Sequence, residues 1–256
     1  MRCLANILPL FLVACTQGGE KRPLQTTPPT AVQVTQRAFV LAAIVARGAA
    51  ERSVGDPEAE AFRVEVLQWL DAAGVTSALE PQELEILQAP LGTLTEQQAK
   101  NAGWRAEGLG VLAWALNQWE LASFDVPTDA AVVAETLGFL KPEGLELLNS
   151  AQLRSPLETK ELARRMYLIH MKLRLADQGS RSPDIYEVAK RLRVDPDKLG
   201  LVEDDLVIDD TPLKAASEDL VRMTLSTVVE RHRAANWLLG DHPVYSEVIY
   251  AFRGME

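Results

Sequence analysis

Five ionisable side chains are placed so that they could form a polar cluster between two predicted helices. Arg105 and Glu107 fall in the most apolar helical stretch of the chain, and Glu230, Arg231 and His232 are consecutive in another long one. A charge inside such a helix must be paired or neutralised, because removing it from water is costly. Two interpretations follow: a ligand site in which arginine binds a carboxylate or phosphate group, or an ion-pair network that fixes how the helices cross.

Metal binding or acid–base catalysis by histidine is the alternative to these two interpretations. The chain has three histidines, His170, His232 and His242, none four residues from another, and it has no HExxH motif. We therefore expect no metal and no cofactor. If His232 acts as a general base, the protein is instead an enzyme of unfamiliar type that uses a polar cleft around Arg105, Glu107 and His232.

The elements that must position these side chains are predicted to be helices. Capping boxes are expected at Ser155 and Thr95. A capping residue stands directly before a proline, as N-cap and N1 positions favour, at Asp56, Ser155, Ser182, Asp195 and Thr211. Apolar residues then recur at helical spacing. The expected helices cover residues 34–51, 56–74, 82–88, 96–121, 129–140, 142–149, 155–179, 182–192 and 212–239, and Pro243 opens a last one.

Residues 96–121 are expected to form the central helix, because they are apolar on more than one side. Gly103, Gly108 and Gly110 each cost about 0.8–1 kcal/mol inside a helix, so we expect a neighbouring helix to approach closely there. Only residues 201–209 have strand character, which predicts at most one small hairpin. The predicted fold is therefore all-α, a single multi-helix globular domain.

The N-terminus indicates export. Arg2 precedes a short apolar run, residues 4–14, which is shorter than the ~20 residues that span a bilayer. The run ends in Leu12-Val13-Ala14-Cys15, which resembles the lipobox of bacterial lipoproteins. The resemblance implies that residues 1–14 are a lipoprotein signal peptide and that Cys15 becomes the lipidated first residue. The alternatives are an ordinary secretory signal that contains a cysteine, or a buried N-terminal helix.

A tether is expected after Cys15. Residues 16–30 are rich in Thr, Gln, Gly and Pro and hold few large apolar groups, so they cannot bury enough surface to fold. The helical domain then covers residues 31–256. Cys3 is the only other cysteine, and its removal with the signal leaves no thiol for catalysis, redox chemistry or a metal site. We therefore expect a domain outside the cytoplasm, held in the bacterial cell envelope by lipid.

Longer blocks of sequence carry a family resemblance. They are residues 37–51 (RAFVLAAIVARGAAE), 89–94 (APLGTL), 104–116 (WRAEGLGVLAWAL) and 230–240 (ERHRAANWLLG). These blocks resemble a bacterial family of uncharacterised domains, DUF4272, with residues 37–51 as its first helix and 230–240 as its late helix. The tail at residues 245–250 departs from the family's pattern. The resemblance implies an all-α domain and brings no assigned activity.

The composition of the chain limits the kinds of partner that it can bind. A formal net charge of −10 argues against nucleic acid, whose binding needs clustered Lys and Arg. The sequence predicts contact with the membrane through the lipid anchor, and with an envelope protein or a small polar ligand. The leading hypothesis is a membrane-anchored helical binding or interaction lipoprotein rather than an enzyme. A purely structural envelope protein that self-associates is a third interpretation.

Overall fold

The structure is a computed structural model, which describes residues 27–180, 184–199, 201–202 and 205–249. The predicted signal peptide, Cys15 and most of the predicted tether lie outside the described residues. Within them the fold is all-α, as predicted, with one small antiparallel sheet. None of the described helices combines the length and apolar character needed to cross a bilayer.

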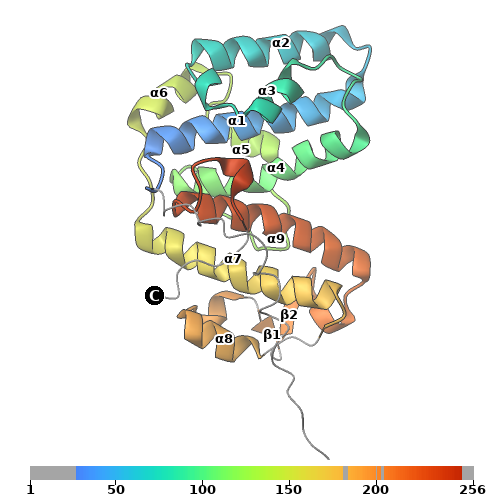
Figure 1. The fold of residues 1–256 in the computed structure, drawn as a ribbon, viewed down its shortest axis with the longest axis vertical. Helices are drawn as coiled ribbons and strands as arrows, with labels where there is room; N and C mark the ends of the chain where they lie inside the picture. Colours follow the sequence, from blue (N-terminus) through green and yellow to red (C-terminus); the bar gives the residue numbers. More distant parts are fainter. Residues whose placement is uncertain (1–26, 181–183, 200, 203–204, 250–256) are drawn as a thin grey trace, which may run out of the picture.

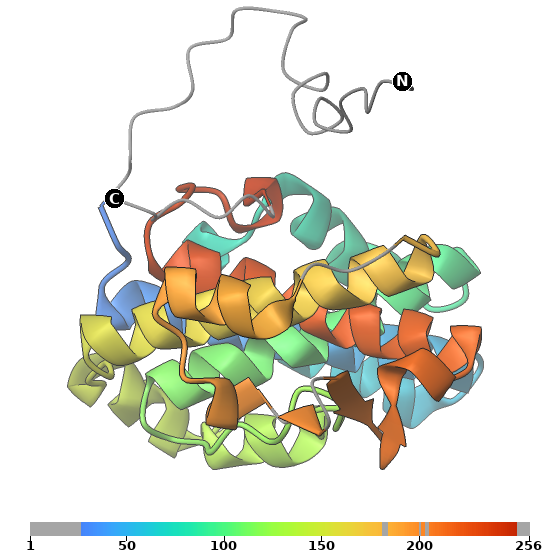
Figure 2. The ribbon, with the colours of Figure 1, turned by 90° about the horizontal axis from the view of Figure 1, so that it is seen from below.

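The described helices are stacked side by side in layers (Figure 1). Four long helices form the spine of the stack in the order α1, α4, α9 and α7, each packed against the next. α2 and α3 cover α1 at one end of the stack, and α8 packs on α7 at the other (Figure 1); Figure 2 shows the stack viewed from the α8 end. The bounds are α1 Ala31–Ala50, α2 Pro57–Ala72, α3 Pro81–Gln88, α4 Glu96–Ala115, α5 Ala130–Thr136, α6 Pro142–Ser150, α7 Pro156–Asp177, α8 Ile185–Leu192 and α9 Glu218–Leu238.

Several predicted start signals are helix caps. Asp56 accepts a backbone N–H in the first turn of α2, and Thr95 and Ser155 form capping boxes with Gln98 and Glu158. These contacts satisfy N–H groups that have no partner within the helix. α2, α4 and α7 therefore begin where the sequence predicted.

Two further caps lie in the C-terminal third. Asp184, rather than Ser182, caps α8, because its carboxylate accepts the N–H groups of the first turn. Ser182 itself lies outside the described residues. Asp195 precedes a short 3₁₀ turn, Pro196–Leu199, and not an α-helix.

Two predicted helices end or shrink early. α4 stops at Ala115 rather than at residue 121, because Asn117 adopts a left-handed conformation with φ of 60°. The helix predicted after Pro243 is a single 3₁₀ turn, Tyr245–Glu247. The chain after α4 therefore forms a loop, which returns to the polar core between α4 and α9.

The sheet explains where α9 begins. β1 (Leu201–Val202), β2 (Asp205–Ile208) and β3 (Thr211–Pro212) are antiparallel neighbours in that order. The hairpin predicted at residues 201–209 is present. Thr211–Pro212 belongs to the added strand instead of starting a helix, and Ser217 caps α9.

The apolar core lies on both sides of α1. An aromatic group of Phe39, Trp69 and Phe139 packs under α2, with ring centroids 4.9 Å and 5.2 Å from Trp69. On the opposite side α1 meets α4 at Gly48, where a Cβ atom would lie only 2.7 Å from the Cβ of Ala102. This crossing therefore requires glycine in α1.

The glycines of α4 face different groups. Gly108 faces the hydroxyl of Tyr245 and also Leu41 of α1, so the predicted close approach of a helix is confirmed there. Gly110 faces Thr128 in the loop after α4, and the space around Gly103 is open. Close packing at α4 thus comes from a tail and a loop as well as from a helix.

Candidate functional site

The five side chains of the predicted polar cluster lie at or beside the contact of α4 with α9, but they form three separate groups. Successive residues of a helix point about 100° apart, since a turn takes 3.6 residues. Glu230, Arg231 and His232 therefore leave α9 in three directions. Their partners are Arg105, Glu107 and His170, respectively.

The ion pair of Arg231 and Glu107 is sealed inside the domain. Arg231 is 0% exposed and Glu107 is 2% exposed, and Arg231 Nε donates to Glu107 Oε2 at 2.9 Å. Thr128 donates its backbone N–H to Oε1 at 3.0 Å and its hydroxyl to Oε2 at 2.9 Å. Both carboxylate oxygens of Glu107 are thus bonded, which offsets the cost of burying its charge.

Arg231 has no free donor for a ligand. A guanidinium carries five N–H groups. Besides the bond to Glu107, those of Arg231 donate to the carbonyls of Ala122, Ser123 and Val126 at 3.2, 2.8 and 2.6 Å, and to Thr128 Oγ1 at 3.4 Å. These partners belong to the loop after α4. The pair therefore holds this loop in place, which favours the structural interpretation.

His232 belongs to a buried histidine pair. Its Nδ1 lies 3.0 Å from Nδ1 of His170 in α7. Burial, the main cause, lowers the pKa of His170 to about 4 and that of His232 to about 3; the charge of Arg174 also lowers the first, and His170 the second. Both rings are therefore neutral at pH 7, and one Nδ1–H donates to the other Nδ1. No group of three metal-ligating side chains occurs in the part of the chain that the structure describes.

Arg105 is the predicted cluster residue that borders a cavity. Its Nη1 donates to Glu230 Oε2 at 2.9 Å, and Arg233 Nη1 donates to the other oxygen at 2.6 Å. Burial alone would lower the pKa of Arg105, but the negative charge of Glu230 raises it above its ordinary value, so the guanidinium stays charged. The Arg105 side chain is 23% exposed and lines a cavity of about 420 Å³.

This cavity, the Arg105 pocket, has mostly polar walls from α3, α4 and the loop between them. Arg37 of α1 binds two of its carboxylates, at 2.7 Å from Glu83 and 3.5 Å from Glu80. Glu80 also accepts the backbone N–H of Ser246 at 3.2 Å. The polar side chains of the lining are those of Glu80, Gln82, Glu83, Glu85, Thr93, Gln98, Asn101, Arg105 and Ser246.

Tyr245 packs against both Arg37 and Arg105, and the sequence did not predict this contact. It is 1% exposed, and the guanidinium carbons of Arg37 and Arg105 lie 5.6 and 5.8 Å from its ring centroid, within cation–π range. Burial raises the pKa of its hydroxyl. The one signal in the sequence was Gly108, whose missing side chain leaves room for that hydroxyl.

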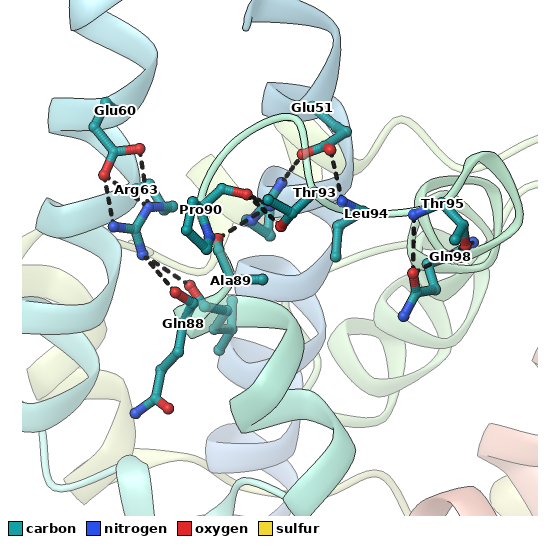
Figure 3. A network of polar contacts seen from close by, with 12 residues as sticks. Glu51, Glu60, Arg63, Gln88, Ala89, Pro90, Thr93, Leu94, Thr95 and Gln98 are labelled. Atoms are coloured by element: carbon teal, nitrogen blue, oxygen red, sulfur yellow. Dashed lines mark hydrogen bonds and ion pairs between the residues drawn. The ribbon is translucent and has the colours of Figure 1, made fainter.

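A second polar network holds residues 89–94, the loop that forms one wall of the Arg105 pocket (Figure 3). Arg47 and Arg63 donate to the carbonyls of residues 87–90 at 2.9 to 3.4 Å. These carbonyls include the last ones of α3, which have no partner within the helix. The two arginines therefore cap α3 and fix where the loop begins.

Glu51 holds the far end of the same loop. Its Oε1 accepts the N–H of Leu94 at 2.8 Å (Figure 3). Burial would raise the pKa of Glu51, but hydrogen bonds from Arg47 and from the N–H groups of Gly92 and Leu94 lower it below its ordinary value. Gly92 has φ of +86°, which favours glycine. Residues 89–94 are one of the blocks that resemble DUF4272. Hydrogen bonds with the charged side chains of Arg47 and Glu51 therefore fix the conformation of this pocket wall.

Comparison with known proteins gives a family and no activity. No curated protein and no solved structure matches the chain. A family profile described as "Domain of unknown function (DUF4272)" matches residues 22–189. This segment includes α1 to α7, with Arg105 and Glu107, whereas Glu230, Arg231 and Tyr245 follow it. The match includes the blocks at residues 37–51, 89–94 and 104–116, whereas the block at 230–240 lies outside it. Because the match spans more than half of the sequence, the chain belongs to the DUF4272 family, as predicted.

Proposed function

We propose that this chain is a membrane-tethered binding module of the bacterial envelope, with the Arg105 pocket as its ligand site. One observation carries the proposal: Arg105 lines a cavity, whereas Glu107, Arg231 and His232 have internal partners away from it. A volume of about 420 Å³ suits a small molecule, since ligand pockets range over about 300–1,000 Å³.

The lining favours a small polar ligand that is neutral or positively charged. Three glutamates and one arginine line the pocket, and that arginine is already bonded to Glu230. Glu85 is exposed and adds negative charge at the rim. The amides of Gln82, Gln98 and Asn101 supply both donors and acceptors. Hydroxyls, amides and amines match such a surface, and a dianion does not.

The histidine pair supports binding over catalysis. A general base must reach a substrate proton with its lone pair, at about 2.6–3.2 Å. His232 is 0% exposed, faces His170, and is not among the residues that line the Arg105 pocket. The enzyme alternative needs Arg105, Glu107 and His232 in one cleft, and these side chains point to three different places.

The tether is tested by mass and fractionation. We expect the intact mass of the expressed protein to show loss of residues 1–14 and addition of lipid at Cys15, with the protein in the membrane fraction. Cys15→Ala should abolish both the lipid mass and the membrane association. A soluble, unlipidated wild-type product would refute the membrane-tethered part of the proposal.

The ligand site is tested with a panel of small amines, amides and sugars. A member that binds should raise the melting temperature saturably, because it binds the folded state. Glu85→Gln, which removes a pocket charge, should weaken an amine several-fold, whereas Glu146→Gln on α6 should not change its affinity. If no member of the panel gives a saturable shift, the Arg105 pocket is not such a site.

A further inference from the structure

A second cavity, separate from the Arg105 pocket, lies beside α7. Its volume is about 400 Å³, and it shares no lining residue with the Arg105 pocket. Its walls come from the first half of α7, the end of α4, the segment around residues 120–121 and residues 193–195 after α8. Any property of this cavity is therefore independent of the function proposed above.

Arg165 of α7 lines this cavity, and no acidic side chain of the described residues forms an ion pair with it. Its Nε atom is buried without a hydrogen-bond partner, and no ion pair within 4.0 Å reaches it from the described residues. Burial lowers the pKa of Arg165, and the positive charge of Arg231 lowers it further, while Glu161 acts in the opposite direction. A partly desolvated charge without a partner is costly, and an anion placed beside it would remove that cost.

The other charges around the cavity disfavour a simple anion. Three arginines and four acidic residues line it, which gives a formal charge of −1. Arg154 is already engaged, because it pairs with Glu120 at 2.6 Å and lies 4.9 Å over the ring of Trp114. A ligand with only negative charge would be attracted by Arg165 but repelled by the four acidic residues of the lining.

We propose that this cavity binds a small zwitterion of the amino-acid type, with its carboxylate on Arg165 and its ammonium near Glu161. These two residues are four apart on α7, so their side chains start about 5–6 Å apart on one face of the helix. That separation suits a molecule whose two charges are a few bonds apart. The guanidinium binds a carboxylate through two parallel hydrogen bonds, and Trp114, Leu121 and Leu162 offer apolar wall to a side chain.

The experiment uses the full chain and the free proteinogenic amino acids, each as a thermal-shift probe, followed by calorimetry on the best one. We expect at least one to give a saturable shift. Its N-acetyl form, which lacks the ammonium, and its amide, which lacks the carboxylate, should each bind about tenfold weaker, which corresponds to about 1.4 kcal/mol.

Arg165→Met and Arg164→Met are the matched variants. The two arginines are neighbours on α7 with similar burial, but only Arg165 lines the cavity. Arg165→Met should weaken the amino acid about tenfold, and Arg164→Met should leave its affinity unchanged. The proposal is overturned if no amino acid shifts the melting temperature, if the N-acetyl form binds as well as the free one, or if folded Arg165→Met protein binds like the wild type.

Discussion

Two arginines near each other in this domain have opposite surroundings. Arg231 of α9 is 0% exposed and makes five hydrogen bonds, one to Glu107 and four to the loop after α4. Arg165 of α7 is partly buried, is close enough to Arg231 to be affected by its charge, and makes no hydrogen bond within the described residues. Both charges are desolvated, yet among the described residues only Arg231 has an ion-pair partner and hydrogen-bond acceptors.

The difference separates a charge that supports the fold from one that is available to a ligand. A buried guanidinium whose five donors are all used can only hold its surroundings in place. A guanidinium that lines a cavity and makes no hydrogen bond to the described residues, as Arg165 does, keeps donors that a ligand could use. Arg105 lies between these cases, since one of its edges binds Glu230 and another borders its pocket.

The largest effect should come from Arg231→Met. It removes the counter-ion of Glu107 and leaves carbonyls of the loop after α4 without donors. Breaking a buried pair in this way costs about 3–5 kcal/mol, so the free energy of unfolding, measured with urea, should fall by that amount. Arg222→Met on the same helix is the control, because its side chain is 59% exposed and exposed pairs contribute about 0–1 kcal/mol. Similar losses in both variants would contradict the comparison.

Acid should destabilise the domain through the histidine pair. Unfolded histidine titrates near 6.5, whereas burial lowers the pKa of His170 to about 4 and that of His232 to about 3. Below pH 6.5 the unfolded chain therefore binds protons that the folded domain does not. Stability should fall as the pH drops from 6.5 towards 4, by up to about 1.4 kcal/mol per pH unit for each histidine.

A variant without the pair isolates this effect from the carboxylates. His170→Gln/His232→Gln protein keeps two polar side chains in place but cannot take up these protons. Its stability should vary less with pH than that of the wild type between 6.5 and 4. Parallel curves for the two proteins would show that the pair does not govern the acid response.

The sequence predicted helices well because their signals are local. A cap such as Thr95 or Ser155 and a 3.6-residue apolar repeat lie within one segment, so they can be read without the rest of the chain. The same reasoning failed at Thr211–Pro212, where pairing with β2 outweighs a good helix start. Hydrogen bonds to a distant strand leave no trace in the local pattern.

The candidate site was only partly predictable for the same reason. The partners Arg105–Glu230 and Glu107–Arg231 were in the predicted group, because charges on apolar helices need partners. The sequence did not predict that these two pairs are separate or that His232 faces His170. Both features depend on how each helix is rotated about its axis, which composition does not determine. Tyr245 was missed because its burial depends on the position of the tail against Gly108.

Gly108→Ala tests the contact between α4 and Tyr245, and its expected loss of stability is smaller than that of Arg231→Met. A Cβ at this position would overlap the hydroxyl of Tyr245, and overpacking of this kind costs about 1–3 kcal/mol. Tyr245→Phe should recover much of the loss, since it removes the overlapping oxygen. Gly103→Ala is the control on the same helix: its Cβ meets nothing, so it should stabilise the protein by about 0.8–1 kcal/mol. A loss at Gly103 as large as at Gly108 would mean that helix geometry, and not Tyr245, is responsible.

The smallest effect on stability should come from Arg165→Met, and this makes the comparison with Arg231 sharp. Methionine retains an apolar stem of similar length, so packing along α7 is kept. The change removes a desolvated charge that has no hydrogen bond within the described residues and that is repelled by Arg231. The free energy of unfolding should therefore stay within about 0.5 kcal/mol of the wild type or rise. A loss of the size expected for Arg231→Met would show that Arg165 supports the fold, and the distinction between the two arginines would fail.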